Sequence, residues 1–513
     1  MQSNDAPNDA PSDAIASILA RGPARDPAAF LKAASAALDQ GQPGLAEAAL
    51  ASAVQAAPGE VRFWQFLGLA RRALQDSAGA NQAFARAAAL SPQDPLIAHS
   101  LARTALEAGY PALEPFNRAR LLAPQDGSVI LGRIAALLAA GKGADARSQL
   151  AALLAANPGW TEGHMALAKL TAQIAPDEPL DTSLRQALGG HPQAGALWHT
   201  LFEVLMQAQD YAATIAAVDQ ARSALGSGDE LDRIEALCLS EQGEAAAAQV
   251  LFDRLPFPHS ADAATWPLRN FIRLGRYDEA MLLAEQNFGA EGEPLLWPYR
   301  ALLWRLRGDP RWAWLEGDSR LIGTYDIAPG LASLGNLAQV LRGLHQAQGA
   351  PLDQSVRGGT QTDGNLLARA EPELRQLRTV LLEAVADYVA QLPPPDPAHP
   401  VLLARRSPLS VAGAWSVRLT DRGFHVDHVH SQGWISSACY ITVPQPDPAR
   451  PEAGWLAFGE CRDLLPDLAG FRTEAPVPGK LVLFPSIMWH GTRPFGSGER
   501  MTVAFDIARP PQP

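Results

Sequence analysis

Cysteine is scarce in this chain of 513 residues, which has only Cys238, Cys439 and Cys461. Thiols so few and so widely spaced exclude a disulfide framework and a cysteine-based zinc site, and they indicate a reducing compartment. The chain also has no run of basic residues, and its formal net charge is −12. We therefore expect no nucleic-acid partner, because phosphate binding requires clustered Lys and Arg.

Long apolar runs are absent as well. No stretch approaches the roughly 20 apolar residues that a membrane span requires. The first residues, Met1 to Pro7, lack the basic segment and apolar core of a secretory signal. These absences predict a cytoplasmic protein without a membrane partner. The hydrophobic share of 47% against 19% charged residues indicates a well-packed chain, whose length requires two or three domains.

Prolines recur at a nearly constant spacing through the first part of the chain. The intervals between successive prolines are 34, 32, 34 and 34 residues, measured from Pro58 through Pro92, Pro124 and Pro158 to Pro192. This is the period of the tetratricopeptide helix–turn–helix repeat, whose units stack into a solenoid because each buries its apolar face only against its neighbours. The sequence therefore predicts an α-solenoid over residues 27–315. A flexible tail rich in Asp, Asn, Pro and Ser is predicted to precede it, over residues 1–26.

One repeat can be checked position by position. The unit ending at Pro92 has the residue types of the tetratricopeptide pattern at Trp64, Leu67, Gly68, Ala80, Phe84, Ala87 and Pro92. Large side chains of one helix are expected to fill the notch left by Gly and Ala on the other, and proline ends the second helix. The concave face of such an array can hold a peptide or a partner protein, which is our hypothesis for its role.

Short strand patterns replace the helical ones toward the C-terminus. Residues 331–347 and 371–392 have the apolar spacing of amphipathic helices, and we expect a helical lead-in over residues 316–400. Five strands separated by Gly and Pro turns then follow at 415–419, 437–443, 454–458, 480–484 and 501–505. The spacing leaves no room for crossover helices, so it predicts a double-stranded β-helix, or jelly roll, over residues 401–513. The fold class is therefore multidomain α + β, with an α-solenoid followed by a jelly roll and its flanking helices.

A polar, glycine-containing segment, residues 353–362, lies between the two predicted helices of the lead-in. Loops of this kind connect packed elements and carry function more often than the elements themselves. The segment is expected either to line a pocket or to form a solvated connection, and the sequence does not decide between the two.

Four of the eleven histidines fall in the strand region: His425, His428, His430 and His490. Two ligands one residue apart on a strand point to the same face, and a third from a distant strand completes one face of an octahedron. Three metal positions then stay open for a keto acid and O2. Arg500, ten residues after His490, can bind a carboxylate bidentately, as its planar guanidinium favours.

Two neighbouring pairs compete for the first two ligand positions. His425 and Asp427 form a His-x-Asp pair, whose carboxylate would offset the charge of Fe(II), and His428 and His430 form a His-x-His pair. On a regular strand the two pairs face opposite sides, so only one of them can line the site. A β-bulge would allow a mixed set. Both pairs stay open on this reasoning.

The stretch from about Asp353 to Ala508 resembles a family of 2-oxoglutarate- and Fe(II)-dependent oxygenases with prolyl-hydroxylase-like jelly rolls, some of which also carry tetratricopeptide repeats. The resemblance is carried by Gln354-Ser355, Gly359-Thr360-Gln361-Thr362, His428-Val429-His430, Ser436-Ser437, Gly479, Phe484-Pro485-Ser486, His490 and Arg500. A lone His-x-His motif would be weak evidence for this family, whereas the whole ordered set of residues is specific to it. The resemblance favours His428, His430 and His490 as the metal ligands, with His425 and Asp427 beside His490 as the alternative.

The resemblance also implies an activity. It implies an Fe(II)- and 2-oxoglutarate-dependent dioxygenase that uses O2 to hydroxylate a C–H bond of a peptide, a protein or a small molecule. Arg500 would hold the far carboxylate of 2-oxoglutarate, with Thr502, Tyr440 and Ser436 around it, and the array would recruit the substrate or a partner. Two rival hypotheses are a repeat scaffold with an inactive jelly roll, and a cupin-like iron dioxygenase with an all-His site that does not use 2-oxoglutarate.

Overall fold

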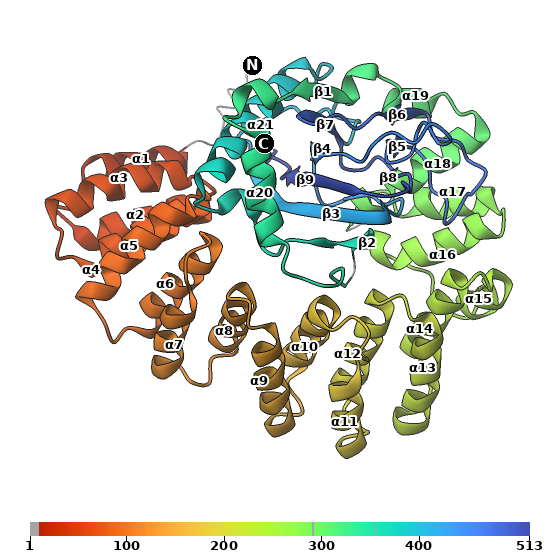
Figure 1. The fold of residues 1–513 in the computed structure, drawn as a ribbon, viewed down its shortest axis with the longest axis horizontal. Coiled ribbons are helices and arrows are strands. Elements are labelled where there is room, and N and C mark those ends of the chain that lie inside the picture. Colours follow the sequence, from red (N-terminus) through yellow and green to blue (C-terminus); the bar gives the residue numbers. More distant parts are fainter. Residues whose placement is uncertain (1–9, 290–291, 353, 513) are drawn as a thin grey trace, which may run out of the picture. The chain divides into compact units, whose positions relative to one another are not determined.

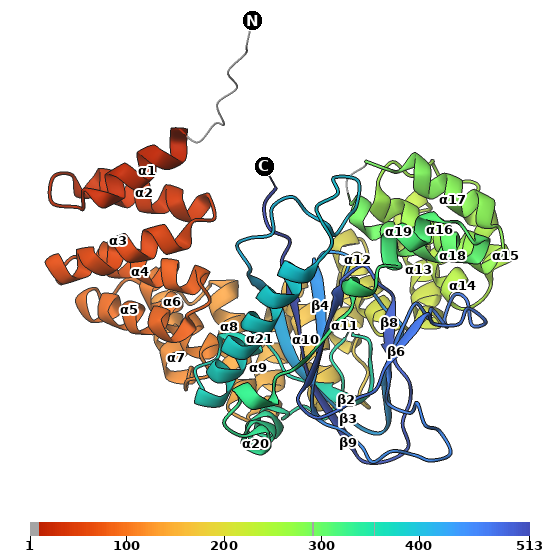
Figure 2. The same cartoon turned by 90° about the horizontal axis from the view of Figure 1, so that it is seen from above.

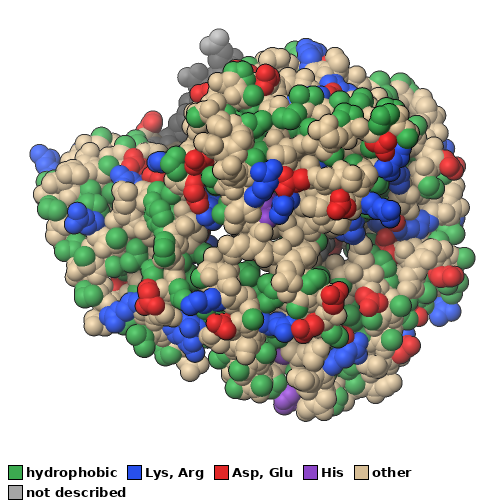
Figure 3. Space-filling model, viewed as in Figure 1, with side chains coloured by type: hydrophobic (Ala, Val, Ile, Leu, Met, Phe, Trp, Pro, Cys, Tyr) green, Lys and Arg blue, Asp and Glu red, His purple; other side chains and the backbone are tan. Residues whose placement is uncertain are grey.

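The computed structural model describes residues 10–289, 292–352 and 354–512. The chain forms two compact units, one of residues up to 146 together with 368–375, and one of residues 147–367 together with 376 to the C-terminus. Within the described ranges, no helix is both long and apolar enough to cross a membrane. On the face shown in Figure 3, basic and acidic side chains are interspersed.

Antiparallel helix pairs build the first unit. Its helices are α1 (Ala10–Ala20), α2 (Pro27–Asp39), α3 (Pro43–Ala56), α4 (Val61–Ala73), α5 (Ser77–Leu90), α6 (Pro95–Glu107), α7 (Leu113–Leu122) and α8 (Gly127–Ala139). Helix α1 corrects the prediction of a flexible tail over residues 1–26, because its Ile15 and Leu19 are buried in the core that α2 and α3 share. Residues 1–9 lie outside the described residues.

Helix pairs continue through the second unit. They are α9 (Gly143–Ala156), which begins at the end of the first unit, α10 (Thr161–Ile174), α11 (Thr182–Gly190), α12 (Gly195–Gln207), α13 (Tyr211–Leu225), α14 (Asp229–Glu241), α15 (Ala245–Phe252), α16 (Ala261–Arg273), α17 (Tyr277–Gln286), α18 (Trp297–Arg307) and α19 (Arg311–Glu316). Figure 1 shows the pairs following one another along the chain. The predicted α-solenoid of tetratricopeptide-like repeats is confirmed.

The predicted packing of one helix into the notch of another is also present. A Cβ atom on Gly68 of α4 would lie 2.7 Å from the ring of Phe84 on α5, so only glycine fits there. The prolines of the repeat have a second role, because their carbonyl oxygens accept from side chains six residues later. The indole Nε1 atoms of Trp64 and Trp198 donate to the carbonyls of Pro58 and Pro192 at 2.9 Å in both cases.

Most turns within the helix pairs contain a left-handed residue, although the turn between α10 and α11 does not. Glycine holds the positive φ in six of these turns, and glutamine does so in two: Gly41, Gln75, Gly109, Gly141, Gln209, Gly243, Gly275 and Gly308. A left-handed conformation costs a residue with a side chain roughly 1–2 kcal/mol, whereas glycine adopts it freely. Gln209, with a φ of 59°, therefore keeps its side chain at a position that favours glycine.

Two antiparallel sheets form the C-terminal part of the second unit. The strands are β1 (Gly323–Asp326), β2 (Val356–Gln361), β3 (Val411–His425), β4 (Ile435–Thr442), β5 (Leu456–Phe458), β6 (Arg472–Glu474), β7 (Lys480–Pro485), β8 (His490–Thr492) and β9 (Glu499–Ile507). The larger sheet has the order β1-β7-β4-β9-β3-β2, and the smaller one β6-β5-β8. Phe458 of the smaller sheet contacts Phe484 of the larger one, with ring centroids 4.9 Å apart. The predicted jelly roll is confirmed.

Two helices flank the larger sheet, as predicted. They are α20 (Leu334–Leu344), which packs against β4, and α21 (Pro372–Gln391). Figure 2 shows both beside the strands. The hydroxyl of Tyr388 on α21 donates to the carbonyl of Leu321 at 2.7 Å, just before β1.

The lead-in over residues 316–400 was predicted to be helical, but it also contains strands. It contains the two edge strands of the larger sheet, with β1 pairing with β7 and β2 with β3. The polar segment 353–362, with Asp353 outside the described residues, supplies β2. Its glycines and polar side chains lack the apolar alternation that marks a strand, and the backbone hydrogen bonds to β3 decide its conformation instead.

The later repeats pack directly on the jelly roll within the second unit. The backbone N–H groups of Gln348 and Gly349 donate to the carbonyl of Gln173 on α10, at 2.7 and 3.1 Å. The indole of Trp489 donates to the carbonyl of Pro298 on α18 at 3.1 Å. Residues on both sides of the predicted boundary near 315 therefore belong to one compact unit.

Candidate metal centre

The two segments that carry the histidines are joined by their backbones. Strand β3 ends at His425, and the residues from Val426 to Trp434 are outside any regular strand. His428 and His490 nevertheless form an isolated antiparallel bridge, in which the N–H of each donates to the carbonyl of the other at 2.9 and 3.0 Å. This bridge, and not a continuous strand, sets the position of His428 beside His490.

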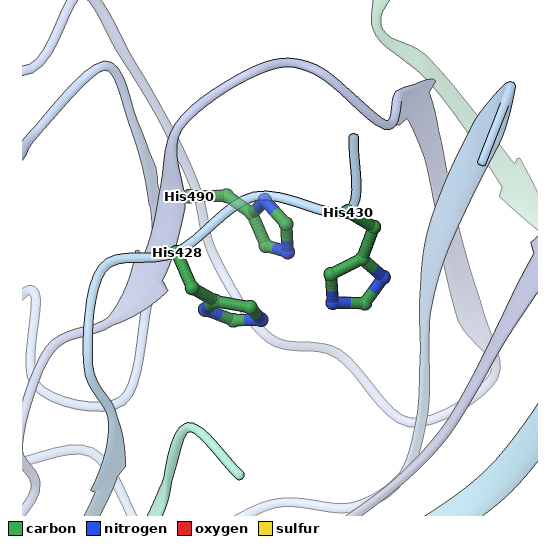
Figure 4. A group of neighbouring side chains, drawn as sticks. All are labelled: His428, His430 and His490. Carbon is green, nitrogen blue, oxygen red and sulfur yellow. The ribbon is translucent and has the colours of Figure 1, made fainter. Parts of the chain in front are cut away.

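Three histidine side chains converge on one point. The candidate ligand atoms of His428, His430 and His490 all lie within 4.8 Å of one another. The ring centroids of His428 and His490 are 4.3 Å apart, and those of His430 and His490 are 5.4 Å apart. Figure 4 shows the three rings turned toward a common space. His490 is buried and the other two are half-buried.

Backbone carbonyls determine which nitrogen carries the hydrogen in two of these rings. The Nδ1 atom of His428 lies 2.8 Å from the carbonyl oxygen of Val426, and that of His490 lies 2.9 Å from the oxygen of Met488. A carbonyl oxygen only accepts, so each Nδ1 atom carries the hydrogen. Each Nε2 atom is then left with its lone pair, which is the form that binds a metal ion.

The third ring contacts a carboxylate through its Nδ1 atom. The Nδ1 atom of His430 lies 2.8 Å from an oxygen of Asp506 on β9. The hydroxyl of Ser436 donates to the same carboxylate at 2.6 Å, and it is 2.9 Å from the hydroxyl of Ser486. Ser436, which we expected beside the cosubstrate, is therefore placed behind His430, where it holds the carboxylate that orients this ring.

Burial keeps His428 and His490 neutral. Loss of hydration, with a smaller contribution from the neighbouring His430, lowers the pKa of His428 to about 3. Burial also places the pKa of His490 well below its ordinary value, with His428 and His430 adding to the effect. Neutral imidazoles bind metal without first releasing a proton, so the site is ready for a cation at neutral pH.

Asp427 is bound by an arginine. Its buried carboxylate accepts from Arg462 three times: from the backbone N–H at 2.9 Å, from Nε at 2.7 Å and from Nη2 at 2.5 Å. A carboxylate held in this way by a bidentate guanidinium is already compensated in charge. His428, His430 and His490 are the residues whose ligand atoms converge, and the group does not include Asp427.

His425 lies nearer to the histidine cluster than a regular strand would place it. Its ring stacks on that of His428 with centroids 6.0 Å apart, and both rings contact the hydroxyl of Ser355, at 3.0 Å from His425 and 3.3 Å from His428. The expectation that residues 425 and 428 face opposite sides assumed a continuous strand. The strand ends at His425, which frees the following residues to turn this histidine and His428 toward the same cavity.

Arg500 is a buried cation without a carboxylate partner. Its residue is 2% exposed, and its Nε atom has no hydrogen-bond partner among the described residues. The hydroxyl of Tyr440 is buried and also without a partner in that part of the chain, and the guanidinium carbon lies 5.0 Å from the centroid of the Tyr440 ring. Burial lowers the pKa of Arg500 and raises that of Tyr440. A buried, unpaired guanidinium is costly, so its donors suit an anionic ligand.

A cavity of about 1300 Å³ connects these residues. Arg500, Thr502 and Asp506, which alternate along β9, all line it together with the three histidines. Its lining also includes residues of the repeat array, among them Tyr211 and Trp266. Tyr440 stands behind Arg500 and supports it from outside the lining.

The sequence reasoning missed two residues of this site. Asp506 continues the two-residue alternation of Arg500 and Thr502 on β9, and that spacing was the signal for it. Arg462 gave no such signal, because it reaches Asp427 from a loop 35 residues later in the chain.

By its fold, the C-terminal part of the chain belongs to the class of double-stranded β-helix proteins, and it contains three convergent histidines and a buried arginine on β9. Residues 413–506 match the sequence model of a family described as "Putative 2OG-Fe(II) oxygenase". The chain therefore carries a domain of the 2OG-Fe(II) oxygenase family at its C-terminus, behind tetratricopeptide-like repeats. No curated protein matches the chain.

Solved structures are similar to separate parts of the chain. A tetratricopeptide repeat protein from Parabacteroides merdae is 15% identical over 49% of this chain and 96% of its own, with a TM-score of 0.29. A prolyl-4-hydroxylase from Pseudomonas putida is 15% identical over 38% of this chain and 95% of its own, with a TM-score of 0.27. HygX from Streptomyces hygroscopicus, solved with nickel and 2-oxoglutarate bound, is 14% identical over 37% of this chain and 84% of its own, with a TM-score of 0.26. The family assignment rests on residues 413–506 and not on these low scores.

Proposed function

We propose that this protein is an Fe(II)- and 2-oxoglutarate-dependent dioxygenase that hydroxylates a C–H bond. One observation carries the proposal: three histidines converge on one point, in the same cavity as a buried arginine that no carboxylate of the described residues pairs with. Three neutral nitrogen ligands suit Fe(II) and leave positions for a keto acid and O2. The unpaired guanidinium suits the second carboxylate of 2-oxoglutarate.

Each residue has a defined part in this scheme. His428, His430 and His490 would hold the metal, and Asp506 would fix the ring of His430 through its Nδ1 hydrogen. Arg500 would bind the far carboxylate of 2-oxoglutarate, with Thr502 beside it in the lining and Tyr440 packed against Arg500 from outside the cavity. The bound iron and cosubstrate would supply the activation of O2, and the cavity would exclude water and orient the substrate C–H bond.

An all-histidine ligand set is the proposal for the metal. It is supported by the capture of the Asp427 carboxylate by Arg462, which occupies both carboxylate oxygens. The alternative set of His425 and Asp427 with His490 would require that buried ion pair to break. Removing one partner of a buried pair is strongly unfavourable, because it leaves an uncompensated charge.

The substrate is proposed to be a peptide, a protein or a small molecule that enters between the repeat array and the jelly roll. The support is the shared cavity, whose volume of about 1300 Å³ is larger than the roughly 300–1000 Å³ typical of small-molecule sites. In this proposal the repeats do more than recruit a partner, because their side chains form part of the wall that a substrate would touch.

Conversion of 2-oxoglutarate to succinate by the Fe(II)-loaded protein tests the proposal. We expect slow turnover without a prime substrate, and an Arg500→Gln variant should raise the KM for 2-oxoglutarate by at least about tenfold while metal binding persists, because a charge-assisted pair is lost. Arg320→Gln is the matched control, since Arg320 pairs with Asp318 at the surface and does not line the cavity.

The rival hypotheses predict different results in the same assay. A scaffold with an inactive jelly roll would form no succinate, even with iron bound. A dioxygenase independent of 2-oxoglutarate would consume O2 at the same rate in the Arg500→Gln variant and in the unmodified protein. Either result would rule out the proposed function.

A further inference from the structure

The cavity at the metal centre has two walls. One wall is the jelly roll, with the histidines and β9. The other comes from the repeat array, through the α12–α13 turn that holds Gln209, the start of α13 at Tyr211, and α16 at Trp266. All of these residues belong to the second compact unit. A substrate in the cavity would therefore touch array side chains directly.

Most of the acidic side chains of this cavity already have a cationic partner. Asp427 pairs with Arg462, and Glu241 and Asp463 share Arg269, whereas Asp506 is hydrogen-bonded to His430. The basic side chains are not balanced in the same way. Among the described residues, no carboxylate pairs with Arg500 or with Arg357, which also lines the cavity.

Arg357 lies on β2 and is held in place by neutral oxygens. Its Nη1 atom donates to the carbonyls of Gln354 and Val356 at 2.8 and 2.9 Å, and its Nη2 atom donates to the side-chain oxygen of Gln209 at 2.6 Å. A guanidinium has five N–H donors, so the Nε hydrogen and one Nη2 hydrogen have no partner in the described part of the chain. The side chain is fixed and half-buried, and it keeps both its charge and its free donors.

Gln209 contributes to this arrangement at a conformational cost. It occupies the left-handed turn position, where six other helix pairs have glycine. The repeat array therefore supplies the residue that orients Arg357, from a turn that points at the jelly roll. Ser355, two residues before Arg357, contacts His428 at 3.3 Å, which places this part of β2 next to the candidate metal ligands.

We propose that Arg357, oriented by Gln209, is a second anion site in the cavity and binds a carboxylate of the substrate that is oxidised. The inference rests on the proposed oxygenase function and adds the chemical class of the substrate, which is a carboxylate-bearing molecule. Arg500 binds the cosubstrate acid and Arg357 the substrate acid. The carboxylate is either an acidic side chain of a polypeptide or a small free acid.

Binding of short probes to the full-length protein tests this site. The protein is loaded with Zn(II) and 2-oxoglutarate, and saturation-transfer NMR compares acetyl-Ala-Glu-Ala-amide with its Gln isostere and with butyrate. We expect the Glu peptide to bind at least about tenfold more tightly than the Gln peptide, as a charge-assisted pair would give. Arg357→Gln should abolish this preference, and Arg357→Lys should keep part of it. Arg320→Gln, at a surface ion pair with Asp318, should leave it unchanged.

Three results would overturn the proposal: equal binding of the two peptides, a preference that persists in Arg357→Gln, or a preference that emerges only in Asp353→Asn. The last would mean that an acid of the chain itself neutralises Arg357. If butyrate binds as tightly as the Glu peptide, the source is a small acid, and if it binds more weakly, the source is a polypeptide.

The two proposals fail separately. Arg500→Gln should weaken 2-oxoglutarate binding by at least about tenfold and leave the preference for the Glu peptide intact. A protein that shows this preference but never forms succinate would contradict the oxygenase function and retain the anion site.

Discussion

At the scale of single residues, the decisive feature is how the side chains around the histidines are engaged. Asp427 and Asp506 are both buried or half-buried carboxylates next to this cluster, yet they have different partners. Arg462 holds Asp427, whereas Asp506 accepts from the Nδ1 hydrogen of His430. The first carboxylate is bound to Arg462 in the loop that follows β5, and the second contacts the ring of His430, a candidate ligand.

Exchange of the competing ligand candidates gives the first prediction at this scale. His430→Ala should lower the Fe(II) content of the purified protein below one equivalent, because one of three ligands is lost. Asp427→Ala should retain iron, with some loss of stability from the unpaired Arg462. Metal analysis after gel filtration provides the measurement. Full iron in His430→Ala together with empty Asp427→Ala would support the alternative pair.

The hydrogen bond between His430 and Asp506 gives the second prediction. Asp506→Asn should weaken Co(II) binding by about 10–100-fold, the usual effect of losing the carboxylate that orients a histidine ligand. Titration followed by the visible absorption of Co(II) would show this. Asp447→Asn is a suitable control, because Asp447 is paired with Arg450 at the surface and lies outside the cavity. Unchanged affinity in Asp506→Asn would mean that this contact does not position the ligand.

At the scale of elements, one acidic residue joins a helix to two strands. Glu499 begins β9 and accepts from Arg342 of α20 at 2.6 Å, from Arg418 of β3 at 2.7 Å and from Thr442 of β4 at 3.2 Å. The hydrogen bond from Arg342 is the main reason why the pKa of Glu499 falls to about 2, with Arg418 adding to it and partial burial opposing it. The strand that presents Arg500 to the cavity is thus fixed at its first residue.

The contacts of Glu499 predict that the stability of the protein depends on pH. The pKa of Glu499 is lower in the folded protein than its ordinary value of 4.5, so its stabilising effect is fully present above pH 4.5 and is lost as the pH falls toward 2. Urea unfolding of Glu499→Gln should show lower stability than the unmodified protein at pH 7, and the difference should shrink across that window. Glu383→Gln, at an exposed site on α21, should show no such trend. A difference that is constant with pH would contradict the assignment.

At the scale of the whole molecule, the later repeats and the jelly roll behave as parts of one unit. Glu241 of α14 binds both Arg269 and Arg273 of α16, and these two arginines also bind Asp463, next to the Arg462 that holds Asp427. A chain of ion pairs thus runs from the array to the loop of the metal centre.

Truncation gives the prediction for this scale. A fragment of residues 316–513 lacks the partners of Trp489 and of Asp463, and we expect it to aggregate or to lose metal binding. A fragment of residues 147–513 keeps those partners and should bind Co(II) with an affinity close to that of the full chain. Circular dichroism and Co(II) titration would compare the two. Normal metal binding by residues 316–513 would show that the array does not support the site.

The sequence alone predicted much of the fold and the chemistry, for local reasons. The spacing of the prolines and the fit of Gly68 to Phe84 follow from the helical repeat, and the five apolar strands follow from their alternation. The edge strands β1 and β2 escaped prediction, because their residues carry no such pattern and their backbone pairing to β7 and β3 is a long-range contact. Helix α1 escaped because a polar composition masked Ile15 and Leu19.

The sequence by itself determined that a tetratricopeptide-like array precedes a jelly roll, and which histidines and arginine could form a metal and keto-acid site. Only the tertiary structure decided how Asp427 is engaged, because its partner Arg462 is 35 residues away in the chain. It also decided that Gln209 meets Arg357 across 148 residues, so that the array forms a wall of the cavity. Periodicity within an element is a local property, whereas contacts between distant segments depend on how the elements pack.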